Sequence, residues 1–268
     1  MTQPVPILML HEVSARPDPR YRKYTLTPRE LDDRLDWLRA NGYESVGMDD
    51  LLAARRGERA LPAHPVVITF DDGGRDCIEH AVPALIQRGF TATFYIVAGV
   101  VGAPMRWLRA EIGFELPAAD WPALRAAEAA GMSCEAHSVT HPRLALVSAE
   151  DCRSELTRGR AMLEEGLGHP VRHLAYPFGS HSAETTSIVD GSDAYHRTSH
   201  LMSGRRPRSS SSARTRSSGI ESGCWELPSA GVELSAVCRL PAAGVELSAG
   251  CRLPFAGSPT LTPLRVRS

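Results

Sequence analysis

Two short motifs carry side chains that could bind one metal ion together. Residues 69–73 (TFDDG) end an apolar segment with two adjacent carboxylates, Asp71 and Asp72, and residues 137–141 (HSVTH) supply His137 and His141. On a helical turn, this spacing places both imidazoles on one face, within reach of one cation. Either motif alone is often a plain turn or a coincidence. Together they supply two imidazoles and a carboxylate, which leave coordination positions open for water and substrate, so the sequence predicts a catalytic metal site.

A third motif, residues 174–179 (LAYPFG), ends another strand-like segment. Its proline, aromatic residue and glycine are compatible with an ordinary turn from strand to loop. They are also compatible with an exposed backbone N–H that points at a developing oxyanion. The residues alone leave both interpretations open.

The segments that must position these motifs alternate between strand-like and helix-like patterns. Apolar segments predict strands at residues 6–13, 66–70, 91–97, 133–136 and 171–176. Helical patterns lie between them at residues 28–41, 75–88, 120–130 and 148–167. This alternation is typical of a parallel β/α architecture, in which catalytic groups gather where the strands end. The three motifs each follow a predicted strand, as such a site requires.

Several helix boundaries carry capping signals. Thr27 and Ser148 each begin a capping-box pattern, and a proline follows Thr27 at the first helical position. Asp120 can cap a third helix, and Gly89 and Gly131 follow the last periodic residues of two helices. These signals predict where the helices begin and end.

The chain changes character beyond about Thr186, where no helical or strand period survives. Residues 205–218 are an Arg/Ser tract with almost nothing to bury, and a 13-residue repeat follows, AGVELSAVCRLPA and then AGVELSAGCRLPF. Two or three such units are too few and too rich in proline to build a solenoid. We therefore expect a domain over residues 1–185 and an irregular tail without a stable fold over residues 186–268.

The overall balance of charge gives no reason to expect binding to nucleic acid or to an anionic membrane. The 268 residues carry a net charge of −1, with 20 basic and 27 acidic residues up to position 194 and 10 basic and 4 acidic residues after it. No apolar stretch approaches the length of a membrane span, and no signal-peptide pattern is present. The expected location is the cytoplasm, and the sequence predicts no oligomeric state.

The three strand-end motifs, in this order, resemble those of the polysaccharide deacetylase (NodB-homology) family. The opening segment PILMLHEV also resembles the first strand of many members, and the resemblance covers about residues 5–185. It implies an α/β fold of the distorted (β/α) barrel type. Because later family motifs are missing here, the barrel is expected to be incomplete at its C-terminal end.

The resemblance also implies roles for single residues. It makes Asp71 the catalytic base, and it makes Asp72, His137 and His141 the ligands of a divalent metal, with Zn²⁺ as the expected ion. The backbone N–H of Phe178 would bind the oxyanion. The implied reaction is hydrolysis of a carbon–nitrogen bond that is not a peptide bond, namely removal of acetyl groups from N-acetylated amino sugars in a glycan.

This chain departs from the family pattern at two points. The family's third motif usually begins with an arginine that orients the catalytic aspartate, and Ala175 stands there. The motif that carries the general-acid histidine should lie beyond residue 190, and we find none, although His196 and His200 lie in that region. Loss of a general acid is expected to lower the rate by roughly 10²–10⁴.

Further side chains give weaker predictions. His11 ends the first predicted strand and either faces the site or is structural, and His181 is expected in a groove or at the surface. Trp107 and Trp121 could line a sugar groove, although ordinary packing is the simpler interpretation. Cys134 is expected to face the core. The histidines expected at the surface are His64, His80, His169 and His173.

Two other functions compete with an active deacetylase. One is a catalytically impaired remnant that keeps the metal site and binds glycans, as the missing acid motif and the unusual tail suggest. The other is an iron oxygenase with two histidines and one carboxylate. That class usually places its first histidine and its carboxylate close together on one strand, which does not match this sequence.

Overall fold

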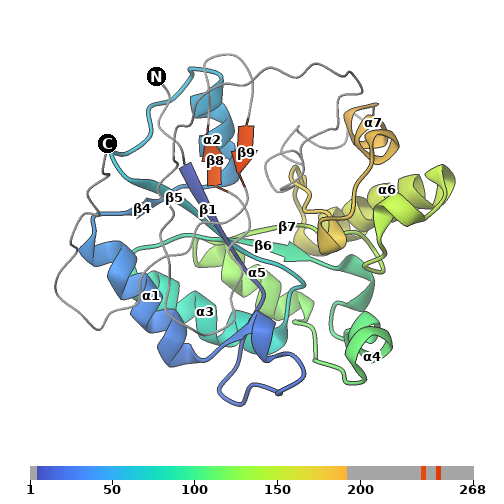
Figure 1. Cartoon of the computed structure of the whole chain (residues 1–268), viewed down its shortest axis with the longest axis horizontal. Helices are drawn as coiled ribbons and strands as arrows, with labels where there is room; N and C mark the ends of the chain where they lie inside the picture. The colour runs from blue at the N-terminus through green and yellow to red at the C-terminus, as the bar shows by residue number, and fades with distance from the viewer. Residues whose placement is uncertain (1–4, 192–236, 240–245, 249–268) are drawn as a thin grey trace, which may run out of the picture.

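The computed structural model describes residues 5–191, 237–239 and 246–248 and shows an α/β fold (Figure 1). Its main sheet has the strand order β7-β6-β5-β1-β8-β9, with β4 paired to β5 beside this path. The strands of this sheet are β1 (Val5–Leu10), β4 (Glu44–Ser45), β5 (Pro65–Phe70), β6 (Thr93–Ile96), β7 (Ser133–Ala136), β8 (Val237–Arg239) and β9 (Glu246–Ser248).

Strands β1, β4, β5, β6 and β7 are parallel, as the sequence predicts. The register pairs Leu10 with Phe70 and Phe70 with Phe94, so the ends of β1, β5 and β6 lie side by side. Among the described residues, the sheet path stays open between β7 and β9, as expected of an incomplete barrel. A separate two-stranded sheet joins β2 (Glu12–Val13) to β3 (Thr25–Leu26).

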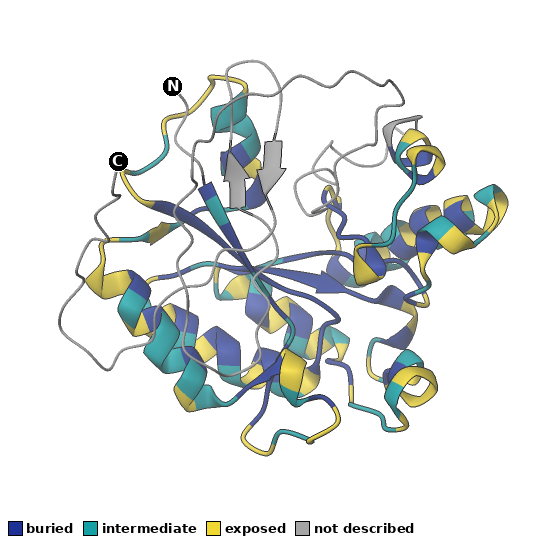
Figure 2. Cartoon of the chain, in the orientation of Figure 1, coloured by how far each residue is buried: buried dark blue, intermediate teal, exposed yellow. Residues whose placement is uncertain are grey.

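Helices cover both faces of the parallel strands, and Figure 2 shows their buried sides turned toward the sheet. Leucines at the helical spacing 31, 35 and 38 are fully buried, as are several residues of the helices that follow. The helices are α1 (Pro28–Ala40), α2 (Met48–Arg55), α3 (Arg75–Arg88), α4 (Arg106–Ile112), α5 (Trp121–Ala129), α6 (Ala149–Leu167) and α7 (Ala183–Gly191).

The predicted helix starts at Thr27, Asp120 and Ser148 are confirmed, although the second of the two predicted capping boxes, at Ser148, is reduced to a side-chain cap. Thr27 and Glu30 form a complete capping box at the start of α1, and Asp120 and Ser148 accept backbone N–H groups at the starts of α5 and α6. Gly89 ends α3 with a left-handed φ of 73°, a conformation that favours glycine. Local side-chain chemistry therefore sets these boundaries.

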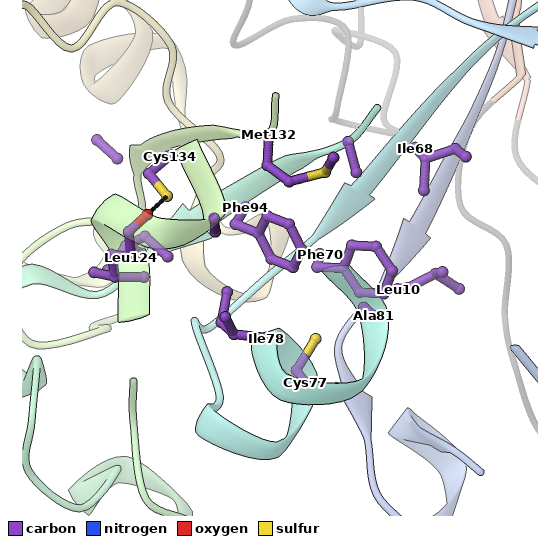
Figure 3. Close-up of a cluster of buried hydrophobic side chains, with 14 of the residues drawn as sticks. Leu10, Ile68, Phe70, Cys77, Ile78, Ala81, Phe94, Leu124, Met132 and Cys134 are labelled. Atoms are coloured by element: carbon purple, nitrogen blue, oxygen red, sulfur yellow. Dashed lines mark hydrogen bonds between the residues drawn. The ribbon is translucent and has the colours of Figure 1, made fainter. Parts of the chain in front are cut away.

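The core between sheet and helices is built around two stacked rings. Phe70 of β5 and Phe94 of β6 lie with their centroids 4.9 Å apart, and residues of α3 and α5 surround them (Figure 3). Cys134 is fully buried, with its Sγ 3.9 Å from the Leu124 carbonyl oxygen, so its expected place in the core is confirmed.

The opposite face of the sheet holds a smaller apolar cluster and a buried histidine whose carboxylate partner is exposed. Ile7 and Val67 pack there against Met48 of α2. His173 is also buried, and its Nε2 lies 3.0 Å from Asp49 Oδ1. The expectation that His173 lies at the surface is therefore wrong, because a carboxylate from a distant helix supplies the partner that a buried imidazole needs.

Residues 171–176 do not form the expected strand. Only an isolated bridge between Leu174 and Ala136 remains of it. The buried Glu135 side chain accepts the backbone N–H groups of Arg172 (2.9 Å) and His173 (2.8 Å), which a ladder of strand hydrogen bonds would otherwise use. A buried carboxylate thus replaces a neighbouring strand here.

The expectation that regular structure ends near Thr186 is also wrong. Helix α7 continues to Gly191 and buries Ile188 and Val189 in the main core. Two short strands, β8 and β9, lie within the two repeats, and β8 pairs antiparallel with Val5 and Pro6 at the free edge of β1. An exposed strand edge offers unpaired backbone groups to such a partner. The remaining tail positions, including His196 and His200, lie outside the described residues.

No helix in the described part of the chain is both long enough and apolar enough to span a membrane.

Candidate metal centre

Strand ends position the predicted site residues. Asp71 and Asp72 directly follow β5, and the Asp71 N–H donates to the Leu10 carbonyl oxygen at the end of β1 (2.8 Å). Asp72 and Gly73 both have a left-handed φ, 75° and 76°, so the chain turns sharply after the strand. On a regular strand two adjacent carboxylates would point to opposite faces, whereas after this turn both are buried and close enough for the Asp72 charge to raise the pKa of Asp71.

The structure brings the three predicted ligands together. Nε2 of His141 lies 3.1 Å from Asp72 Oδ1 and 3.2 Å from His137 Nε2, and His137 Nε2 lies 3.6 Å from Asp72 Oδ1. All three side chains are buried. Such a close triangle of donor atoms is the arrangement that the sequence predicts.

The donor set fits a divalent cation. A tetrahedral ion with bonds of about 2.0–2.1 Å separates its ligand atoms by about 3.3 Å, close to the three distances here. Asp72 Oδ1 is buried without a well-oriented hydrogen-bond donor, although buried carboxylate oxygens normally have one. Two imidazoles and a carboxylate are also ligands that Zn²⁺ prefers.

The two imidazoles are held in different ways. His137 Nδ1 lies 2.9 Å from the Ala175 carbonyl oxygen, which favours the tautomer with a proton on Nδ1 and leaves Nε2 free to bind a metal. The ring of His141 stacks on Trp107 with centroids 4.5 Å apart and meets the edge of Phe178 at 4.5 Å. Trp107 therefore packs against a candidate metal ligand.

The two histidines lie in a loop, and the expected helical turn is absent. Ser138 and His141 have left-handed φ values of 66° and 62°, which no right-handed helix contains. The His141 N–H donates to Ser138 Oγ (3.1 Å), which closes the loop on itself. The helical expectation is wrong because hydrogen bonds to other segments determine this loop's shape.

Tyr21 is a site residue that the sequence gave no reason to select. Its side chain is buried, and its hydroxyl donates to Asp72 Oδ2 (3.0 Å), the oxygen that the imidazoles do not approach. The two residues are 51 positions apart in the chain. No local pattern marks such a contact.

The electrostatics of the site keep His137 neutral and set the two aspartates apart. Burial, reinforced by the Asp72 charge, holds the pKa of Asp71 well above its ordinary value. Burial opposes ionisation of Asp72 as well, but His141 and the other nearby imidazoles outweigh it, so the pKa of Asp72 lies below its ordinary value. Burial and the neighbouring His141 lower the pKa of His137 to about 3. A neutral imidazole beside an ionised carboxylate is the state that binds a metal.

Asp71 lies beside this triangle without an orienting side chain. Within the described residues, no side chain donates a hydrogen bond to it, and its Oδ1 is buried and unpartnered. Ala175 stands at the position of the family's arginine and contributes only backbone contacts, its N–H to Ala136 and its carbonyl oxygen to His137. With alanine at this position, Asp71 Oδ1 is left without a hydrogen-bond donor in the described part of the chain.

The third motif reaches the site through Phe178. This residue has a left-handed φ of 57°, and its ring borders His141 while the Arg143 guanidinium lies 3.9 Å from the ring centroid. Its backbone N–H has no acceptor in the described part of the chain. The motif is therefore a strained turn at the rim of the metal centre.

Among the other described histidines, His11 lies close enough to the site to interact electrostatically with Asp72 and His141. It follows β1, next to Asp71, and burial lowers its pKa while the nearby Asp72 charge raises it. His181 stacks on Tyr176 with centroids 5.1 Å apart and is half-buried, as expected of a groove residue. Trp121 packs against Gly166 of α6 and takes no part in the site.

Comparisons with known proteins agree with this architecture. The family model for polysaccharide deacetylases matches residues 58–192. YxkH of Bacillus subtilis (strain 168) is 23% identical over 186 residues, which cover 69% of this chain and 61% of that protein. The poly-β-1,6-N-acetyl-D-glucosamine N-deacetylase of Escherichia coli (strain K12) is 35% identical over 74 residues, 28% of this chain and 11% of that enzyme.

A solved structure extends the agreement to three dimensions. IcaB from Ammonifex degensii matches with a TM-score of 0.60 at 27% identity, over 70% of this chain and 80% of that one. The chain spans less than two thirds of the length of both sequence relatives. The match to the family model covers half of the chain and includes Asp71 and the three candidate metal ligands. The chain belongs to the polysaccharide deacetylase family.

Proposed function

We propose that this protein removes acetyl groups from N-acetylated amino sugars in a glycan, by hydrolysis at a divalent metal site. The observation that carries the proposal is the placement of Asp71 beside the buried triangle of Asp72, His137 and His141. Zn²⁺ is the ion that this donor set favours. The E. coli relative, whose name specifies a polymer of N-acetylglucosamine, supports the same class of substrate.

The chain's own residues can supply the proton transfers. An ion held by the triangle would act as a Lewis acid, activating water and stabilising an oxyanion. Asp71 accepts the proton from the attacking water, and its raised pKa suits it to hold that proton. The free backbone N–H of Phe178 donates to the oxyanion that forms on the acetyl carbonyl.

His11 takes the role of general acid in this proposal. The leaving amine needs a proton, and His11 is a histidine at the end of β1, beside Asp71, that carries no other assigned role. Burial lowers the pKa of His11, so its neutral imidazole must first take up a proton, which it then gives to the departing nitrogen. The general acid would then come from the first strand, and none would be needed from the tail.

The test is acetate release from defined oligosaccharides by the purified protein with added Zn²⁺ or Co²⁺. The substrates are oligomers of β-1,6-linked N-acetylglucosamine, chito-oligosaccharides and peptidoglycan fragments. We expect Asp71→Asn and His11→Ala each to lower the rate by about 10²–10⁴ while metal binding is retained. Asp36→Asn on the exposed side of α1 is the matched control and should leave the rate unchanged. Full activity in Asp71→Asn would refute the mechanism.

A catalytically impaired, glycan-binding protein is the second candidate. It is favoured by the lack of a side chain that orients Asp71, at the point where Ala175 replaces the family's arginine. This candidate predicts that the protein binds the metal and the oligosaccharides but releases no acetate from any of them.

A further inference from the structure

The loop between the two candidate metal ligands is held in a conformation that its own residues do not favour. Ser138 and His141 both adopt left-handed backbone angles without being glycine. Such angles persist only where surrounding contacts over-determine them. The distance between the imidazoles of His137 and His141 therefore depends on what holds residues 138–140 from outside.

One carboxylate from α6 provides much of that restraint. Glu155 Oε2 accepts the N–H groups of Val139 (2.9 Å) and Thr140 (2.8 Å), and its Oε1 accepts the Thr140 hydroxyl (2.7 Å). Among the described residues, no Lys or Arg forms a salt bridge with Glu155, so these three donors are its hydrogen-bonding partners. Hydrogen bonds to an ionised acceptor are roughly twice as strong as neutral ones.

The other side of the loop is fixed by the segment that follows β6. The Ala98 N–H donates to the Ser138 carbonyl oxygen (3.0 Å), and the Gly99 N–H donates to that of Val139 (2.9 Å). One turn beyond Glu155, a Cβ at Gly159 would lie only 3.0 Å from the Ser138 carbonyl carbon, so α6 approaches the loop very closely. The loop is thus held between α6 and the end of a core strand.

We propose that Glu155 is a positioning residue that sets the spacing of the His137 and His141 imidazoles. Its hydrogen bonds go to Val139 and Thr140, so it acts through the backbone between the two ligands. The proposal rests on the metal site of the proposed function and does not depend on hydrolysis of a glycan. It predicts that loss of the Glu155 carboxylate lowers the free energy of Zn²⁺ binding more than it lowers the free energy of unfolding.

The experiment measures the Zn²⁺ dissociation constant of the full chain by competition with a chromophoric chelator. Glu155→Ala should weaken binding by about 10–100-fold, the range typical of groups that orient metal ligands from outside. Glu155→Gln keeps a carbonyl oxygen for the two N–H groups and an amide for the Thr140 hydroxyl, so it should stay within about threefold of wild type. Glu165→Ala removes an exposed glutamate from the same helix and should change nothing.

A purely structural role would give a different result. It predicts a lower unfolding temperature for metal-free Glu155→Ala with an unchanged Zn²⁺ affinity, and that outcome overturns the proposal. If the alanine variant does not fold, Glu155→Asp replaces it, because the shorter carboxylate cannot reach both backbone donors. A wild-type Zn²⁺ affinity in Glu155→Asp would also overturn the proposal. If the wild-type protein binds Zn²⁺ but releases no acetate, the proposed function is wrong. The Zn²⁺ affinities of the Glu155 variants then still test the present inference.

Discussion

At the scale of single residues, the buried Tyr21 hydroxyl directly orients a candidate metal ligand, Asp72. It fixes Asp72 by one oxygen, and the other oxygen faces the imidazoles. Tyr21→Phe removes only this hydroxyl, so we expect the Zn²⁺ dissociation constant to rise at least about tenfold above that of the wild-type protein. Tyr24→Phe is the control, since Tyr24 is a neighbouring, exposed tyrosine without this contact. Equal affinities in the two variants, measured by chelator competition, would contradict this role for Tyr21.

A second prediction concerns the buried Glu12 carboxyl beside the start of α3. Burial, together with the nearby Asp76, raises the pKa of Glu12 to about 8. The folded chain keeps this proton up to about pH 8, while the unfolded chain loses it near pH 4.5. The folded state therefore binds more protons in this window, and the free energy of unfolding should fall as pH rises from 4.5 to 8.

The slope contributed by Glu12 is at most about 1.4 kcal/mol per pH unit. Glu12→Gln should remove this contribution, whereas Glu79→Gln on the exposed side of α3 should keep it. Urea unfolding of the metal-free proteins at several pH values between 4.5 and 8 measures the difference. Identical slopes for wild type and Glu12→Gln would show that the Glu12 carboxyl does not keep its proton in the folded chain.

At the scale of elements, the approach of the segment after β6 to the histidine loop leaves no room for a side chain at Gly99. A Cβ there would lie 2.5 Å from the Val139 carbonyl oxygen, so the backbone would have to shift. We expect Gly99→Ala to destabilise the protein by about 1–3 kcal/mol and to weaken metal binding, because the displaced loop carries both imidazoles. Gly47→Ala has no atom within 4 Å of the added Cβ and serves as the control in thermal unfolding. An equally small change in unfolding temperature in both variants would show that the histidine loop can shift to accommodate the added Cβ without cost.

The elements that the sequence predicts well are those whose signals are local. Residues 66–70 are apolar and β-branched, and the caps at Thr27 and Ser148 need only a few neighbouring residues. Residues 171–176 were predicted wrongly because Glu135, far away in the chain, takes the backbone donors of that segment. The ligand loop was predicted as a helical turn for the same reason, since its shape depends on Glu155 and on the end of β6.

The same difference between local and long-range signals applies to the residues of the site. The sequence identified Asp71, Asp72 and the two histidines because each follows a strand and lies within a short motif, and the structure brings Asp72, His137 and His141 together. Tyr21 was missed because its contact depends on how a distant loop folds back onto the site. His11 was left undecided because its orientation depends on the pairing of β1 with β5.

At the scale of the whole molecule, helix α7 crosses the boundary that the sequence places at residue 185. Its buried residues Ile188 and Val189 belong to the main core. A chain that ends at residue 185 should therefore be less stable than one that ends at residue 191, by at least about 2 kcal/mol. Both truncations lack β8 and β9, so urea unfolding of the two isolates the contribution of α7. Equal stabilities would support the boundary at residue 185.

The account as a whole depends on one cation at the ends of β5 and β7. Anomalous diffraction at the zinc absorption edge, on crystals grown with Zn²⁺, locates such an ion directly. We predict one strong peak within bonding distance of an Asp72 carboxylate oxygen and of Nε2 of both His137 and His141, with Asp71 beside it and no peak in a His141→Ala variant. A peak elsewhere, or an empty triangle at saturating Zn²⁺, would contradict the account.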